Sequence, residues 1–137
     1  MIRNKAQVQN YLLQKLKSSS ADILEIDLVS KDGLILVSTS RDSAYRDKVA
    51  ALAASVFRPA QKAAGELPFE GVNFVVISGR KQNLYLKEIG EDQLLAVLVK
   101  SGADWECIQR QIVKTSLDLQ YIADMKGKIE DRLGSQS

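Results

Sequence analysis

The sequence predicts an α/β protein of the α+β type, with one five-stranded antiparallel sheet and the element order α-β-β-α-β-β-β-α. A long alanine-rich segment of helical period runs from about residue 44 to 67. Two segments of strand-like pattern precede it, and three follow it, joined by turns too short for a crossover helix. Further amphipathic helical segments stand near both ends. We therefore expect the middle helix on one face of the sheet and the terminal helices on the other.

Composition places the chain among ordinary globular proteins. Its 137 residues are 45% hydrophobic and 26% charged, which suits a single domain over residues 1–137. A lone cysteine, Cys107, cannot form an intrachain disulfide. The longest apolar run, residues 94–99, is far shorter than the ~20 residues that cross a bilayer. The net charge of +2 predicts no nucleic-acid footprint, and we expect a cytoplasmic protein without membrane insertion.

The first helix is expected over residues 4–17. Asn4, with Gln7 three residues later, resembles a capping box, and apolar residues recur along one stripe. The serines at 18–20 end this pattern. The helix is amphipathic, so one side of it should pack on the sheet.

A β-hairpin follows. From Ile23 the period changes to two, which places Glu25 and Asp27 on the polar face of a strand, as solvated carboxylates. The Asp32-Gly33 pair predicts a tight turn. The next strand, residues 34–37, is apolar on both faces and is expected to be covered on both.

The middle helix has an apolar surface wider than the roughly 100° that one sheet covers. We expect one stripe to pack on the protein's own sheet and the other to meet a second copy; burial on two sides within one domain is the alternative. Pro59 predicts a kink or break at residues 55–58. The expected homodimer contacts on this helix are Val49, Ala50, Leu52, Ala53, Val56, Phe57 and Ala60.

The third strand, expected over residues 72–78, contains no proline and no charge. Such a strand at a sheet edge invites pairing, so we expect it to pair with its own copy, with Val72, Phe74 and Val76 in the interface. Strands at 84–89 and 94–100 complete a meander. The last helix is expected to end at Gly127 or Gly134, with a C-terminal tail from about residue 127.

The sequence offers few groups for catalysis or for binding a cofactor. The sequence has no histidine and no P-loop, so the commonest acid/base group and a phosphate-binding loop are missing. We interpret Cys107 as a buried structural thiol and Glu88, Glu91 and Asp92 as solvated carboxylates. We expect no enzyme activity, no cofactor and no metal site.

Three segments in this order resemble the Roadblock/dynein light chain family, which includes bacterial Mgl-type GTPase regulators. They are residues 32–38, residues 49–54, and residues 94–98 with Gly102-Ala103-Asp104. The resemblance covers about residues 21–122, the expected core of the domain. It implies dimers, homomeric or with a paralogue, through the middle helix and third strand, and binding of a Ras-like small GTPase. Pro59 departs from the family pattern.

If a GTPase binds, Arg41, Arg46, Lys48 and Ser55 are the candidate contacts. We expect preference for its GTP form and one GTPase per dimer. An arginine supplied in trans can accelerate GTP hydrolysis, although scattered surface arginines usually serve solvation. The alternative is a small-molecule sensor or a purely structural scaffold of PAS or profilin-like architecture. A sensor needs a cavity with convergent polar groups, whereas the inward positions here are Leu, Ile and Val.

Overall fold

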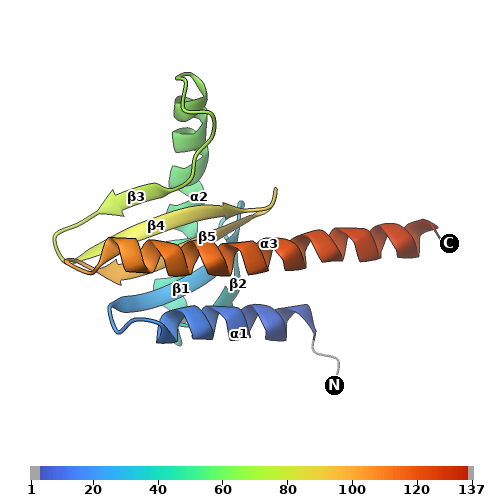
Figure 1. The fold of residues 1–137 in the computed structure, drawn as a ribbon, viewed down its shortest axis with the longest axis horizontal. Helices are drawn as coiled ribbons and strands as arrows, with labels where there is room; N and C mark the ends of the chain where they lie inside the picture. The colour runs from blue at the N-terminus through green and yellow to red at the C-terminus, as the bar shows by residue number, and fades with distance from the viewer. Residues whose placement is uncertain (1–3, 136–137) are drawn as a thin grey trace.

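A computed structural model describes the backbone of residues 4–135 and the side chains as far as residue 125 (Figure 1). The predicted order of elements is confirmed. The elements are α1 (Lys5–Ser18), β1 (Ile23–Ser30), β2 (Ile35–Ser38), α2 (Ser43–Gly65), β3 (Val75–Ser78), β4 (Gln82–Ile89), β5 (Gln93–Lys100) and α3 (Trp105–Ser135).

The five strands form one antiparallel sheet in the order β2-β1-β5-β4-β3. The strand order leaves β2 and β3 at the two edges. The expectation that the second strand is covered on both faces is wrong, because Leu36 is exposed there. A register shift between Leu28 and Val29 leaves Leu36 without a partner on β1. This bulge lets Ile35 and Val37 pack on opposite sides of the sheet while Leu36 points to solvent.

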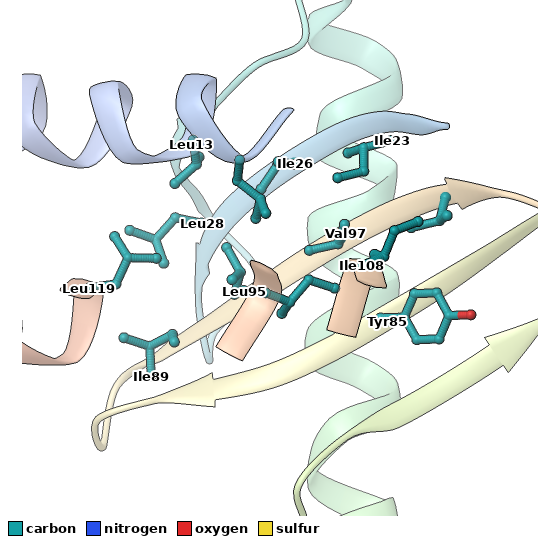
Figure 2. Packing of buried hydrophobic residues seen from close by; sticks show 13 residues of the cluster. Leu13, Ile23, Ile26, Leu28, Tyr85, Ile89, Leu95, Val97, Ile108 and Leu119 are labelled. Atoms are coloured by element: carbon teal, nitrogen blue, oxygen red, sulfur yellow. The ribbon is translucent and has the colours of Figure 1, made fainter. Parts of the chain in front are cut away.

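Helices cover the sheet as predicted: α1 and α3 lie on one face and α2 crosses the other (Figure 1). Figure 2 shows the core beneath α1 and α3, where side chains from both helices meet those of β1, β4 and β5. Its fully buried members include Leu13, Ile26, Leu95, Ile112 and Leu119. A second cluster packs between the sheet and α2, so β5, the central strand, contributes side chains to the core on both faces of the sheet.

Capping residues place the starts of two helices. Asn4 forms the predicted capping box: its Oδ1 accepts from the Gln7 amide at 2.8 Å, and its own amide donates to Gln7 Oε1 at 3.1 Å. Asp42 caps α2 by accepting from the Tyr45 amide at 3.1 Å. Both helices thus begin where the sequence offers an acceptor for an unsatisfied N–H.

The predicted break at Pro59 does not occur, since α2 runs unbroken from Ser43 to Gly65. Proline removes the hydrogen bond to the carbonyl four residues earlier, that of Ser55. Both Ser55 and Pro59 are exposed, so water can bind that carbonyl. The helix therefore tolerates the proline on its solvent side.

Two boundaries differ from the expected ones. β3 begins at Val75 rather than at residue 72, after a turn in which Glu70 and Gly71 have φ values of 57° and 117°. α3 continues through Gly127 to Ser135, so the region expected to be a tail is helical. None of the helices in the described part of the chain is both long and apolar enough to cross a membrane.

Candidate functional site

The helix α2 has an inner stripe that packs on its own sheet. Val49, Ala50, Ala53 and Phe57 are buried there against strand residues including Leu84, Leu86 and Ala96. The sequence had placed these four residues among the dimer contacts. Their side chains pack in the domain's own core, and Val49 also lines an open groove between α2 and the end of β3.

The outer stripe of α2 remains uncovered. Leu52 is 45% exposed, and Val56 and Ala60 are only partly buried. They lie one helical turn apart, so their side chains form a continuous apolar row. The predicted division of α2 into an inner and an outer stripe therefore holds, and of the expected contacts on this helix these three face outward.

The edge strand β3 borders this row. It pairs only with β4, from Val75 opposite Leu86 to Ser78 opposite Asn83, and its other edge carries no strand of the described chain. Val76 is 47% exposed. An apolar edge without charge or proline is a template for another strand, as the sequence indicated.

Two open grooves connect the helix and the strand. One, of about 340 Å³, lies between Tyr45, Lys48 and Leu52 of α2 and Ile77 and Gly79 at the end of β3. Its rim is braced by the amide of Gln82, which donates to the Tyr45 hydroxyl at 3.2 Å. The groove is lined largely by carbon atoms, as expected for a surface that receives a protein side chain rather than a polar metabolite.

The second groove, of about 620 Å³, lies along the C-terminal half of α2. Its lining includes Ala60 and Ala64 of α2, Phe69 in the following turn, and Val72 and Phe74 before β3. Phe74 packs edge-on against Trp105 of α3 with ring centroids 5.5 Å apart. Trp105 in turn stacks on Tyr85 at 3.9 Å. Thus Phe74, expected in the dimer contact, lines this groove and is held there by aromatic packing.

The expected GTPase contacts fall into two groups. Arg41, Lys48 and Ser55 are exposed; Lys48 and Ser55 lie on α2 beside the outer stripe, and Arg41 lies just before this helix begins. The Ser55 hydroxyl donates to the Leu52 carbonyl at 2.9 Å. Arg46 is half-buried, and its Nη1 donates to the Ser40 carbonyl at 3.3 Å. Arg46 therefore contributes to the fold at the start of α2.

Arg46 approaches a pair of buried acids that the sequence interpretation placed in solvent. Glu25 and Asp27 are buried on the α2 face of β1, and Asp27 is fully inaccessible. This correction follows from the strand order, because β1 lies between β2 and β5 and is covered by α2. The signal was available in Val29, which shares the face of Asp27 and is apolar.

Burial, followed by a hydrogen bond with Glu25, raises the pKa of Asp27 to about 8, while hydrogen bonding from Ser38 and the charge of Arg46 oppose the rise. Glu25 Oε2 and Asp27 Oδ2 are both buried without a hydrogen-bond partner. A proton on Asp27 gives this carboxyl a donor for the hydrogen bond with Glu25. This acid pair is structural, since it lies beneath α2 and away from the surface.

The architecture and the sequence identify the family. Residues 9–99, more than half of the chain, match the Roadblock/LC7 domain. The chain belongs to the Roadblock/LC7 family. Among curated proteins, none matches the sequence.

Solved structures share the fold of this Roadblock/LC7 chain. Myxococcus xanthus MglB superposes with a TM-score of 0.79 and 20% identity over 91% of this chain and 94% of its own. Thermus thermophilus gliding protein MglB has a TM-score of 0.77 and 20% identity over 91% and 96%. A Roadblock/LC7 domain from Streptomyces avermitilis has a TM-score of 0.76 and 23% identity over 81% and 93%.

The acidic side chains and the cysteine of the Roadblock/LC7 chain form no group of three or more that is arranged to hold a metal within residues 4–125. The interpretation of Cys107 as a buried thiol is wrong: it is exposed, because Trp105 and Ile108 take the core side of that helical turn. Glu91 and Asp92 are exposed as expected. Glu88 instead forms an ion pair with Lys31, with 2.5 Å between Glu88 Oε2 and Lys31 Nζ. The accessible feature is an apolar surface, which suits protein binding.

Proposed function

We propose that this protein is a homodimeric interaction module that regulates or scaffolds a Ras-like small GTPase. The observation that carries the proposal is the uncovered apolar row of α2 beside the open edge of β3, in a chain of the Roadblock/LC7 family. The resemblance to the family is the basis for proposing a GTPase as the partner. The surface is the basis for proposing a dimer, because a second copy would cover the exposed apolar side chains and pair with the open strand edge.

In the proposed dimer, Leu52, Val56 and Ala60 of one copy meet the same residues of the other across a two-fold axis. Each β3 pairs with the β3 of the second copy, so that one sheet continues through both. Val76 and the groove beside Ala60 and Val72 then become buried. These residues are the part of the expected interface that the domain leaves accessible.

Light scattering tests the dimer. The unmodified protein should give twice the 15.1 kDa of the chain at micromolar concentration. Leu52→Glu would bury a charge without a partner and should return the mass to that of the monomer. Arg58→Glu is the matched control: Arg58 is exposed on the same helix, about 120° around the axis from Leu52, and this variant should remain dimeric. A monomeric unmodified protein would refute the dimer.

The GTPase is proposed to bind across the two-fold axis, which one molecule covers, giving one GTPase per dimer. Discrimination between GTP and GDP requires contact with the switch segments that the γ-phosphate orders. Lys48 and Ser55 are accessible side chains on α2 beside the outer stripe, and Arg41 is accessible just before this helix begins. The module itself has no P-loop, so the nucleotide belongs to the partner.

Titration calorimetry with a Ras-like small GTPase, loaded with GTP or with GDP, is the decisive measurement. We expect tighter binding of the GTP-loaded form, at one GTPase per two chains. Lys48→Glu should weaken binding, whereas Arg58→Glu should not. Equal affinity for both nucleotide states would favour a passive scaffold, and no binding would remove this GTPase as the partner.

One variant distinguishes stimulation of GTP hydrolysis from binding of the GTPase. Arg41 is the exposed arginine among the candidates, so Arg41→Ala should abolish stimulated hydrolysis while binding persists if an arginine acts in trans. Unchanged stimulation would mean that the module acts by rearranging the GTPase's own residues. A thermal-shift screen of small metabolites tests the sensor alternative, which requires a ligand that stabilises the protein by itself.

A further inference from the structure

The end of α2 and the turn that follows it carry apolar side chains that the domain does not cover. Phe57 is the last buried residue of this helix, and Figure 1 shows the part after it rising past β3, the edge strand of the sheet. Ala63 is exposed in this part. Leu67 and Phe69, in the turn that follows, are 59% and 63% exposed. These residues belong to a protruding apolar segment, residues 63–69.

The α2–β3 groove offers the complementary shape. This groove, of about 340 Å³, is the one lined by Tyr45 and Leu52 of α2 and Ile77 of β3, whose side chains are all exposed. The outer stripe of α2 contributes only three side chains to the proposed dimer, fewer than the roughly 20–30 residues per side of a standard stable interface. A groove of exposed apolar side chains beside that stripe extends the interface if a second apolar segment fills it.

Charges around the α2–β3 groove and around the protruding segment are opposite in sign. Lys48 lines the groove, and none of the described residues that line it is acidic. Arg80 and Lys81 are exposed in the turn between β3 and β4, next to lining residues of the groove. The protruding segment contains Glu66, and Glu70 follows it directly. A basic apolar groove therefore favours this acidic apolar segment as its occupant.

The proposed dimer brings the groove of one copy to the protruding segment of the other. In an antiparallel pair of α2 helices centred on Val56, Leu67 of one copy lies opposite Tyr45 of the other, because these two positions are equally distant from Val56 in the sequence. Ala63 of one copy then lies over the groove of the other. Lys62, the nearest basic residue of α2, is exposed about 100° around the helix axis from Ala63, on the side away from the groove.

We propose that the protruding segment of each copy fills the α2–β3 groove of the other. This exchange rests on the dimer of the proposed function, and it adds the residues by which one copy recognises a second copy of the same chain. Glu66 of one copy then lies beside Lys48 of the other, so the surface offered to a GTPase contains side chains from both chains. A paralogue without an acidic apolar turn after α2 would leave the groove empty and would pair less tightly.

Oxidative crosslinking tests the placement of the segment. Tyr45 and Leu67 lie near opposite ends of α2, whose 23 residues span about 35 Å, so cysteines at the two positions cannot join within one chain. In a Cys107→Ser background, which removes the native thiol, Tyr45→Cys with Leu67→Cys should give a covalent dimer. Tyr45→Cys with Gln61→Cys is the matched control and should stay uncrosslinked, because Gln61 lies on the other side of α2, where its Nε2 donates to Glu88 Oε2 at 3.3 Å.

Light scattering separates this exchange from the dimer itself. A protein of twice the chain mass that gives no covalent product from the cysteines at positions 45 and 67 would overturn the exchange and leave the proposed dimer intact. An unmodified protein that stays at 15.1 kDa would overturn both.

A charge reversal tests the electrostatic part of the exchange. Arg80→Glu with Lys81→Glu should weaken the dimer about tenfold in sedimentation over a concentration series, because the two-fold axis applies each change twice. Lys114→Glu, at an exposed position of α3 on the other face of the sheet, should leave the dimer unchanged. Adding Glu66→Lys and Glu70→Lys to the first variant should restore the affinity. An undiminished affinity in the first variant, or no recovery after the second pair of changes, would contradict the exchange.

Discussion

Ser38 of β2 and Asp27 of β1 face each other across the two strands, and the Ser38 hydroxyl donates a hydrogen bond to Asp27 Oδ1. The other oxygen of Asp27 is buried without a hydrogen-bond partner, and Glu25 is the neighbouring acid. The Asp27 carboxyl is thus held on one side by a donor and on the other by a second acid. A proton in this place lets Asp27 donate a hydrogen bond to Glu25 beneath α2.

The pH dependence of stability should report this proton. The pKa of Asp27 is raised from 3.8 to about 8 on folding, so between about pH 4 and pH 8 the folded state retains a proton that the unfolded state releases. The free energy of unfolding should therefore fall as the pH rises through this window, by at most about 1.4 kcal/mol per pH unit, and level off above it. Urea unfolding at a series of pH values measures the slope.

Asp27→Asn is the matched variant, since an asparagine can donate to Glu25 without titrating. Its free energy of unfolding should vary less between pH 4 and pH 8 than that of the unmodified protein. The difference between the two curves removes contributions from other groups. If both proteins show the same slope, Asp27 does not hold the proton.

Ala53 and Leu52 are neighbours in sequence and should respond differently to the same charge. Ala53 is fully buried against the sheet, so Ala53→Glu should destabilise the domain by about 3 kcal/mol or more. Leu52→Glu should leave the fold intact and act on assembly alone. Circular dichroism with thermal melting separates loss of fold from loss of the dimer. A folded Ala53→Glu protein would show that α2 does not pack as described.

Phe57 should carry much of the core on the α2 face. It is 1% exposed and the bulkiest side chain in that cluster, so Phe57→Ala should cost about 3–5 kcal/mol of unfolding free energy. Phe57→Leu leaves a smaller cavity and should cost clearly less. Denaturant unfolding of the two variants gives the comparison, and equal effects would contradict close packing at this site.

Hydrogen exchange at β3 tests strand pairing in the dimer. The amides of β3 that do not bond to β4 face an open edge in a single chain. Pairing with a second copy should slow their exchange, and Leu52→Glu should restore fast exchange there. Amides of β5, the central strand, serve as the internal control because they are bonded in either state. Fast exchange at the β3 edge in an intact dimer would exclude the continuous sheet.

The sequence by itself determined the class, order and approximate extent of the elements, because these follow from local periodicity and capping. Asn4 and Gln7 show this at the first helix, and the alternation after Ile23 shows it at the first strand. It also determined that α2 has two apolar stripes, since helical spacing alone distributes Leu52 and Ala53 around the axis.

Only the tertiary structure decided which stripe is inside, and which polar residues are buried. Glu25 and Asp27 follow the alternation of a one-sided strand, yet β1 lies second from the edge and α2 covers its polar side. Likewise, Leu36 and Cys107 are residue types that are often buried. A β-bulge exposes Leu36, and the rotation of α3 about its axis exposes Cys107. Burial depends on strand order, register and helix rotation, which arise from contacts between residues far apart in the chain and leave no local period in the sequence.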